Sequence, residues 1–287
     1  MRQEIVVAYD GTRQSRAAVE WAAAECRVRR RAGVTVCEVW DGPYPERAEA
    51  VAAEERRLAA LRLFEGVRLA ERLLPGREVR PVLVRGSPKD TLVALSREAA
   101  MLVMGHRAHR GHGGRLAGLL FGSVSAYAAA HAACPVVVVG APPPAPPAGG
   151  VVVGIDAARP DGPETECALR FAVEVARGRS LPLTAVYATR GGGPEGERAL
   201  TRIVEPWRRR CRAGLKIETR VVEAPPLPAL LACAGNAPLL VVGARGAGAR
   251  TRLLGSVGQG LLWRAPCPVA VVHPAPVWPI PFGIPTI

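Results

Sequence analysis

The chain repeats itself once, and this internal duplication constrains the fold more than any other feature of the sequence. In each half an early apolar segment ends in aspartate, at Asp10 and at Asp156. Later in each half the same order recurs: an apolar run ending at Gly105 or Gly243, a Gly-rich loop, a Gly-Ser-Val triplet, and Cys-Pro followed by valines. Repetition of so many features in one order indicates two domains of one fold in tandem.

Length and proline content suggest where these domains begin and end. A chain of 287 residues suits two domains of ordinary size. We expect the first domain over residues 1–140 and the second over 150–273. The Pro-rich segment 141–149 is typical of an extended linker, and a second Pro-rich segment, 274–287, forms a tail.

Each half alternates short apolar segments with longer helical ones. We expect strands near 4–9, 34–40, 79–84, 101–105 and 135–139 in the first half, and near 150–155, 182–188, 216–222, 238–242 and 268–272 in the second. Helices are expected near 14–31, 46–74, 88–99 and 122–132, and between the strands of the second half. This alternation predicts two α/β, Rossmann-like domains, each a five-stranded parallel sheet with helices on both faces.

Polar residues fall where such a sheet binds ligands, at the carboxyl ends of its strands. Asp10 and Asp156 end the first strands, and Ser123 and Ser256 lie where helices begin. The aspartates are either turn or helix-capping residues or acceptors for an adenine amino group or a ribose hydroxyl. The serines are either ordinary N-caps or part of a phosphate site, because a helix start attracts anions and glycine permits their close approach.

Four segments of the first half carry a family resemblance: VVAYDGT (6–12), SRAAVEWA (15–22), RGSP (85–88) and AGLLFGSVS (117–125). With the Cys-Pro-Val strands, they resemble the universal stress protein family in its tandem form, over nearly all of both halves. The resemblance implies the adenine nucleotide alpha hydrolase-like fold. It also implies an ATP site in which the first-strand aspartate contacts adenine. A second-strand backbone group and a glycine loop (Gly, two residues, Gly, nine residues, Gly-Ser or Gly-Thr) complete that site.

The second half fits this motif better. Gly243 and Gly246 match the first two glycines, and Gly255 with Ser256 matches the last pair, with a spacer one residue short. We expect Arg245 and Arg250 to add positive charge for phosphate. The site that the resemblance implies comprises Asp156, Val186, Gly243, Gly246, Gly255, Ser256 and Val257.

The first half departs further from the motif. Ala108 replaces the second glycine, and the loop before Gly122 is four residues too long. This loop holds His106, His109 and His112, for which we expect no metal, because a metal site needs convergent ligands and a fourth donor. The implied site comprises Asp10, Val39, Gly105, Gly122, Ser123 and Val124, and it stays open whether one, both or neither pocket binds nucleotide.

Charge, hydropathy and cysteines bear on location and partners. The net charge of +13 is spread over both halves, which argues against nucleic-acid binding. No apolar run reaches membrane-spanning length, and no signal peptide precedes the first strand, so we expect a cytoplasmic protein without membrane association. Cys134 and Cys267, each before proline, are expected to be buried thiols and not disulfides.

The family resemblance implies a stress-response protein that binds an adenine nucleotide, namely ATP with Mg²⁺ as an accompanying ion, and acts as a regulatory module. The sequence contains neither Gly-x-x-x-x-Gly-Lys-Ser/Thr nor Gly-x-Ser-x-Gly, which favours binding over turnover. Two alternatives stay open: a scaffold that binds proteins and no nucleotide, and a slow ATP hydrolase. We expect the two domains to pair through strands 135–139 and 268–272, and a homodimer is a further alternative.

Overall fold

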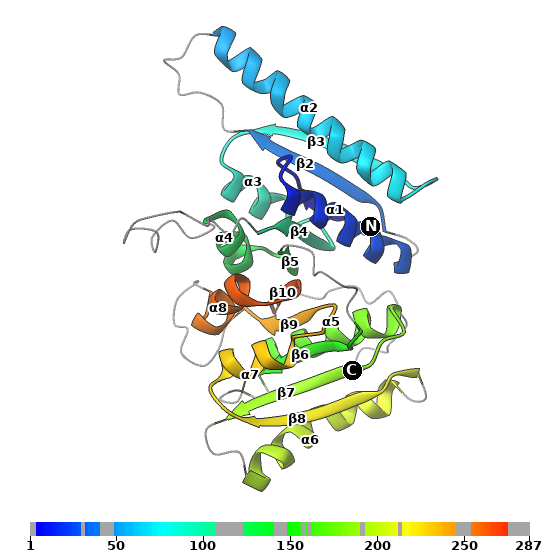
Figure 1. The fold of residues 1–287 in the computed structure, drawn as a ribbon, viewed down its shortest axis with the longest axis vertical. Coiled ribbons are helices and arrows are strands. Elements are labelled where there is room, and N and C mark those ends of the chain that lie inside the picture. Colours follow the sequence, from blue (N-terminus) through cyan, green and yellow to red (C-terminus); the bar gives the residue numbers. More distant parts are fainter. Residues whose placement is uncertain are drawn as a thin grey trace. The chain divides into compact units, whose positions relative to one another are not determined.

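The structure is a computed structural model that describes residues 4–29, 32–40, 49–106, 123–140, 148–156, 159, 162–189, 193–211, 214–244 and 254–274. The chain divides into two compact units, Met1–Pro142 and Pro143–Ile287 (Figure 1).

The first unit alternates strands and helices in the expected way. Its strands are β1 (Ile5–Ala8), β2 (Val34–Trp40), β3 (Val79–Arg85), β4 (Met101–Gly105) and β5 (Val136–Val139). Its helices are α1 (Arg13–Val28), α2 (Glu49–Leu73), α3 (Pro88–Leu95) and α4 (Ser123–His131). The strands pair in parallel in the order β3-β2-β1-β4-β5.

The second unit repeats this topology. Its strands are β6 (Val151–Ile155), β7 (Leu183–Thr189), β8 (Ile217–Glu223), β9 (Leu240–Gly243) and β10 (Val269–Val272). Its helices are α5 (Pro163–Gly178), α6 (Gly193–Cys211), α7 (Pro226–Cys233) and α8 (Ser256–Arg264). The strands pair in parallel in the order β8-β7-β6-β9-β10.

The strand order determines which face each helix covers. Because crossovers between parallel strands are right-handed, α1 and α2 cover one face of the first sheet, and α3 and α4 cover the other. Accordingly α1 contacts α2, and α3 contacts α4. In the second unit α5 and α6 contact the sheet, and α7 contacts α8. The expected parallel sheets with helices on both faces are confirmed.

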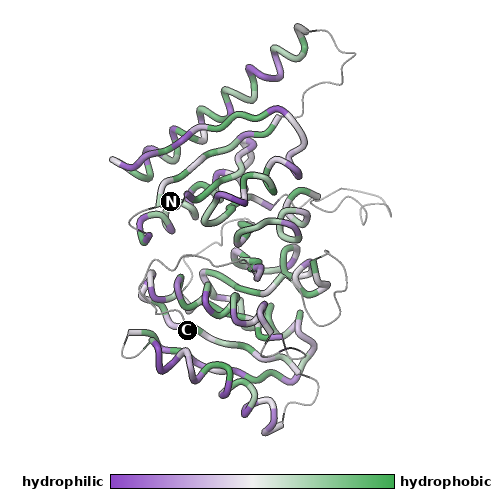
Figure 2. The backbone as a smooth tube through the Cα atoms, turned by 180° about the vertical axis from the view of Figure 1, so that it is seen from behind, coloured by the Kyte–Doolittle hydropathy of each residue, from purple (hydrophilic) through white to green (hydrophobic). Residues whose placement is uncertain are grey.

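The core of each unit lies at its central strands. Ile5, Met101 and Val103 in the first unit, and Leu183 and Leu240 in the second, are fully buried. Figure 2 shows these strands as mainly hydrophobic segments. Each such side chain contributes roughly 1.5–3 kcal/mol on burial, so the valine-rich strands account for much of each unit's stability.

None of the seven cysteines forms a disulfide. Cys134 and Cys267 are buried, as expected, and burial raises the pKa of each thiol to about 12. Within the residues that the structure describes, no helix is both long enough and apolar enough to cross a membrane.

Candidate functional site at the carboxyl edge of each sheet

In both units the strand order reverses beside the first strand, which is where open parallel sheets bind ligands. Continuing the parallel register of β1 and β4 by two residues brings Asp10 level with His106. The register of β6 and β9, continued by three, brings Asp156 level with Ala244. Neighbouring strands lie about 5 Å apart, so each aspartate begins a loop beside the start of the glycine loop.

The second strand of each unit ends one residue past the level of the aspartate. In the first unit the register of β1 and β2 sets Val39, which is half-buried, level with Asp10. In the second unit the register of β6 and β7 sets Ala188 level with Asp156. Val186 lies two residues earlier in the ladder and is fully buried. Ala188 is therefore the residue equivalent to Val39, which sequence reasoning missed because a run of small apolar residues carries no mark of register.

Asp10 holds the turn that starts α1. Its Oδ1 accepts hydrogen bonds from the Thr12 hydroxyl (2.6 Å) and the Thr12 backbone N–H (3.1 Å). Thr12 is the N-cap of α1, and its Oγ1 accepts a hydrogen bond from the Ser15 N–H. The turn interpretation of Asp10 is therefore correct for this oxygen. In the second unit Gly162 is the N-cap of α5 and offers no side chain.

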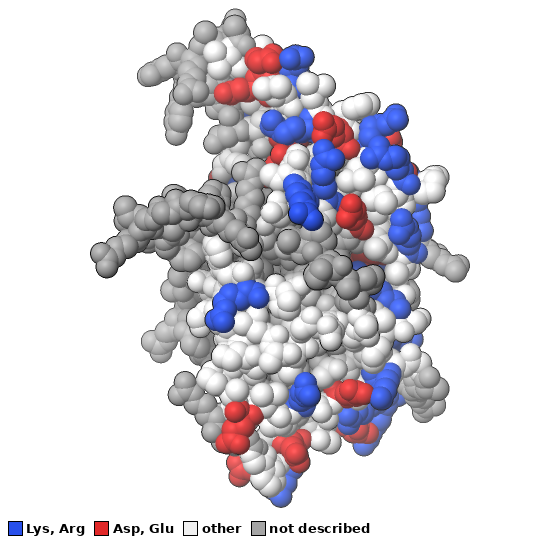
Figure 3. All heavy atoms as spheres, viewed as in Figure 1, with Lys and Arg blue, Asp and Glu red and all other residues white. Residues whose placement is uncertain are grey.

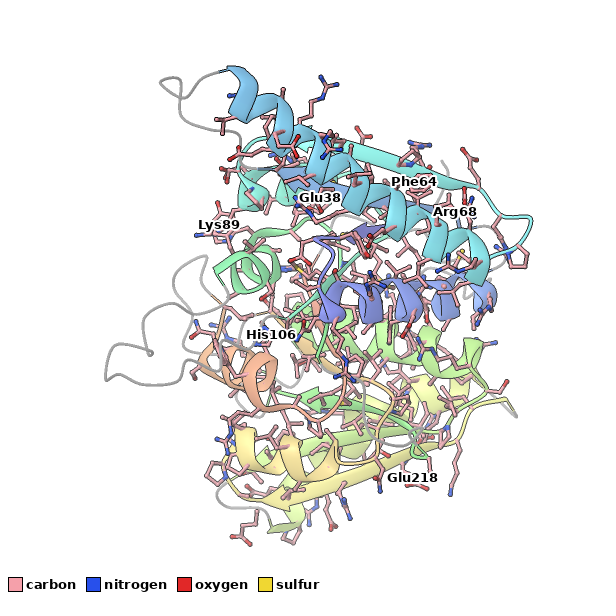
Figure 4. All side chains as sticks on the ribbon, turned by 45° about the horizontal axis from the view of Figure 1, so that its top comes forward. Glu38, Phe64, Arg68, Lys89, His106 and Glu218 are labelled. Carbon is pink, nitrogen blue, oxygen red and sulfur yellow. The ribbon has the colours of Figure 1, made fainter. Side chains whose placement is uncertain are left out.

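A buried charge lies next to the same loop of the first unit. The Glu38 side chain of β2 is 2% exposed and accepts a 2.6 Å hydrogen bond from Arg62 of α2. Arg62 also covers Gly11, which has a positive φ of +76°, and a Cβ there would lie 3.0 Å from Arg62 Cδ. Figure 4 labels Glu38 beneath α2. The second unit has Tyr187 at the position of Glu38, so this ion pair is peculiar to the first loop.

The first glycine of each motif allows a helix to approach the sheet. A Cβ on Gly105 would lie 2.6 Å from the carbonyl carbon of Gln14 and 2.7 Å from the backbone nitrogen of Ser15, both at the start of α1. A Cβ on Gly243 would lie 3.0 Å from Cβ of Glu164, near the start of α5. These glycines therefore have a packing role.

The end of the glycine loop in the second unit carries a helix start. Gly255 is the N-cap of α8, and its N–H donates to the Ala244 carbonyl (3.4 Å), which ties the loop end to the end of β9. Ser256 is exposed and is the first helical residue, so the N-cap interpretation of Ser256 is wrong. Within the described part of the chain, no side chain caps α8. Val257 is half-buried.

In the first unit Ser123 is the first residue of α4, and Val124 is half-buried. Gly122 and Gly246, which the motif assigns to the two loops, lie outside the described residues, as do His109 and His112.

His106 distinguishes the first unit from the second, which has Ala244 at this place. The side chain is 6% exposed, and its Nδ1 lies 3.4 Å from the Ser125 hydroxyl of α4. Burial lowers the pKa of His106. No group of three or more potential metal ligands occurs among the residues described. His106 therefore belongs to the packing between β4 and α4.

The rims of the two edges differ in charge. In the first unit β3 ends at Arg85, and Lys89 of α3 places its Nζ 5.7 Å from the Tyr127 ring of α4. The corresponding residues of the second unit are Glu223, at the end of β8, and Leu227 of α7. Figure 4 shows Lys89 and His106 near α4. At these two positions the first edge therefore carries two cations, where the second carries a carboxylate and a leucine.

Comparisons with known proteins agree with this architecture. The model of the universal stress protein family matches residues 1–140 and 150–273. A universal stress protein of Mycobacterium tuberculosis is 32% identical over 308 residues, with 94% of each chain covered. One of Mycolicibacterium smegmatis is 31% identical over 294 residues, covering 94% of this chain and 97% of that one.

Among solved structures, a universal stress protein from Archaeoglobus fulgidus has the same fold, with a TM-score of 0.74 at 20% identity. The match covers 95% of this chain and 97% of that one. The fold and the duplicated edge define a tandem α/β protein of Rossmann-like type. The chain belongs to the universal stress protein family, and the resemblance expected from its sequence is confirmed.

Proposed function

We propose that this protein binds an adenine nucleotide, with ATP as the ligand, and acts as a regulatory binding module of the cytoplasmic stress response. One observation carries the proposal. At a single edge of the second sheet, Asp156 lies level with Ala244, whose carbonyl holds the N-cap of α8. A hydrogen-bond acceptor for a base or ribose thus stands beside a helix start suited to phosphate.

The start of α8 would hold the phosphates. Gly255 leaves space for an anion because it has no side chain, and the first N–H groups of a helix lack partners within it. The helix dipole adds positive potential there. Asp156 would accept from the adenine amino group or a ribose hydroxyl, and the backbone of Ala188 would face the base from the second strand. Mg²⁺ would bind mainly through phosphate oxygens, as it commonly does.

We propose the second unit as the main nucleotide site. Its glycine motif is nearly complete, whereas Ala108 interrupts that of the first. In the first unit His106 occupies space where the second unit has alanine. Arg85 and Lys89, by contrast, add positive charge that favours phosphate at the first site. We therefore propose that the first site binds nucleotide more weakly than the second but has not lost the ability to bind it.

Nucleotide released from the denatured, freshly purified protein provides the first test, followed by calorimetric titration with ATP and, for base selectivity, GTP. The sharpest variant is Gly255→Asp. Aspartate is a preferred N-cap, so α8 should persist while the added carboxylate repels phosphate. We expect ATP affinity to fall at least about tenfold with thermal stability retained.

Two controls accompany this variant. Gly255→Ser supplies a capping side chain without charge and should bind ATP nearly as the parent does. Ser87→Asp adds the same charge at the N-cap of α3 and should leave affinity for the second site unchanged. Absence of released nucleotide, together with no heat of ATP binding at millimolar ligand, would refute the proposal and leave the scaffold alternative. ATP hydrolysis above the protein-free background would instead support the slow hydrolase.

A further inference from the structure

Helix α2 carries an apolar surface in an unusual place. Among the described residues, the large hydrophobic side chains that remain exposed are Val51 (42%), Leu58 (43%), Leu61 (50%) and Phe64 (60%), and all four belong to α2. Its counterpart α6, which likewise precedes the third strand of its unit, exposes Glu, Arg, Thr, Pro and Gly instead. Clustered apolar side chains in water are typical of an interaction surface.

The exposed cluster does not belong to the face of α2 that covers the sheet. Ala59, Leu63, Val67 and Ala70 form the buried face, which packs on β2 and β3. Figure 1 shows α2 running along these strands, and Figure 2 shows hydrophilic and hydrophobic residues alternating along it. The helix is therefore apolar on two sides, and only one of them is used within its unit.

The outer face is arranged symmetrically about Leu61. At about 100° per residue, positions three, four and seven residues away in either direction lie within about 60° of Leu61 on the helix surface. These positions are Leu58 and Phe64, then Arg57 and Glu65, then Glu54 and Arg68. Each charged residue on one side of Leu61 thus has an opposite charge at the same distance on the other side.

We propose that this face joins two copies of the chain through antiparallel α2 helices, with a two-fold axis at Leu61. Such an axis sets each residue opposite the one at the mirrored distance. Leu61 would pack on the partner's Leu61, and Leu58 on the partner's Phe64. Arg57 would face the partner's Glu65, and Glu54 the partner's Arg68. A parallel pair would instead oppose like charges, which disfavours it.

The charged side chains are placed for these contacts. Arg57 and Glu54 hydrogen-bond to each other (2.9 Å) yet stay 65% and 54% exposed. Glu65 pairs with Arg16 of α1 (2.8 Å) and is 57% exposed. The Arg68 guanidinium lies 5.8 Å from the Phe64 ring, and Figure 4 shows both on α2. Figure 3 shows acidic and basic groups interspersed on the visible face of this unit, and not one charged patch of a single sign. This pattern suits binding of a second copy of the chain, because the acidic and basic residues of α2 can pair with the basic and acidic residues of the partner's α2.

Sedimentation velocity of the full chain over a wide concentration range tests the proposal. We expect a concentration-dependent dimer, and Leu61→Glu should weaken it at least about tenfold, because it sets two carboxylates on the axis. Ala60→Glu is the matched control: it adds the same charge one residue away, on an exposed position outside the face, and should leave dimerisation nearly unchanged.

A charge exchange and a cross-link make the test specific. Arg68→Glu should weaken the dimer by opposing the partner's Glu54, and adding Glu54→Arg should restore it. Leu61→Cys should form an intermolecular disulfide under mild oxidation, because residue 61 faces itself across the axis, whereas Ala60→Cys should not. A monomer at every concentration, or a dimer that Leu61→Glu does not affect, would overturn the proposal. Neither result depends on nucleotide binding, since α2 contributes none of the residues assigned to the nucleotide.

Discussion

Gly105 has a packing role that a single substitution can test. Its missing Cβ lets the backbone of α1 approach β4, and a methyl group there would lie within 2.7 Å of two backbone atoms. We expect Gly105→Ala to lower the free energy of unfolding by about 1–3 kcal/mol, as overpacking does. Urea denaturation measures this change.

Gly140→Ala is the control for that substitution. A Cβ on Gly140 meets nothing within 4 Å, so its effect should stay within about 0.5 kcal/mol. Equal effects of the two substitutions would show that the close contact with α1 is not what requires glycine at position 105.

His106 gives the first unit a dependence on pH. Because burial lowers its pKa, the unfolded chain binds a proton at higher pH than the folded protein does. The contribution of His106 to stability is therefore complete above about pH 6.5, the ordinary value for histidine, and is lost as the pH falls from there through the lowered pKa. In His106→Ala, which reproduces the residue of the second unit, urea midpoints at pH 7 and pH 5.5 should differ less than in the parent. An unchanged difference would contradict this role.

The sequence predicted most of the residues that lie at the carboxyl edge of each sheet, but not their neighbours across the strands or their hydrogen-bond partners. Asp10, Gly105 and Gly243 each stand at a strand end, which their apolar flanks and the duplication could indicate. Ala188 could not be found, because pairing register follows from packing between strands and not from a motif. The sequence likewise could not decide whether Asp10 holds a turn or accepts a hydrogen bond from a ligand. The structure shows that its Oδ1 accepts hydrogen bonds from Thr12.

Within the first helix, α1 depends on a buried ion pair. Arg29 Nε donates to Glu25 Oε1 at 2.7 Å, and the two side chains are 4% and 1% exposed. Arg29→Met would leave a buried carboxylate without this donor and should cost about 3–5 kcal/mol in thermal or urea unfolding. The exposed pair of Arg170 and Glu166 in α5 provides the comparison, and Arg170→Ala should cost less than about 1 kcal/mol. Similar losses for both variants would contradict the importance of burial.

Most helices and strands were predictable, because the spacing of apolar residues and the composition of each segment indicate the same kind of element along most of the chain. The strands fall within one or two residues of their expected positions, since short valine-rich runs between helices leave little choice. Helix ends were less predictable. The segment expected as a helix over 88–99 ends at Leu95. The Ser96 hydroxyl donates to the Val93 carbonyl, and the N–H groups of Arg97 and Glu98 donate to carbonyls three residues earlier instead of four.

At the scale of the whole molecule, duplication followed by divergence explains the asymmetry. Both units have one topology, but the first has His106, the cations Arg85 and Lys89 and the apolar face of α2, whereas the second has the more complete glycine motif. Sequence alone revealed the duplication because its motifs recur in order. It did not reveal the outer face of α2, because a helix with two apolar sides resembles a simply buried one. Pairing of the two domains through their last strands stays a prediction.

Calorimetric titration of the full chain with ATP tests the central claim most directly. We predict tight binding at one site per chain with a weaker second event, and loss of the tight event in Gly255→Asp but not in Gly255→Ser. Asp156→Ala should weaken the tight event and spare the weaker one. Absence of any binding by the folded parent protein, or identical titrations for the parent and Gly255→Asp, would contradict the assignment of the nucleotide to the edge of the second sheet.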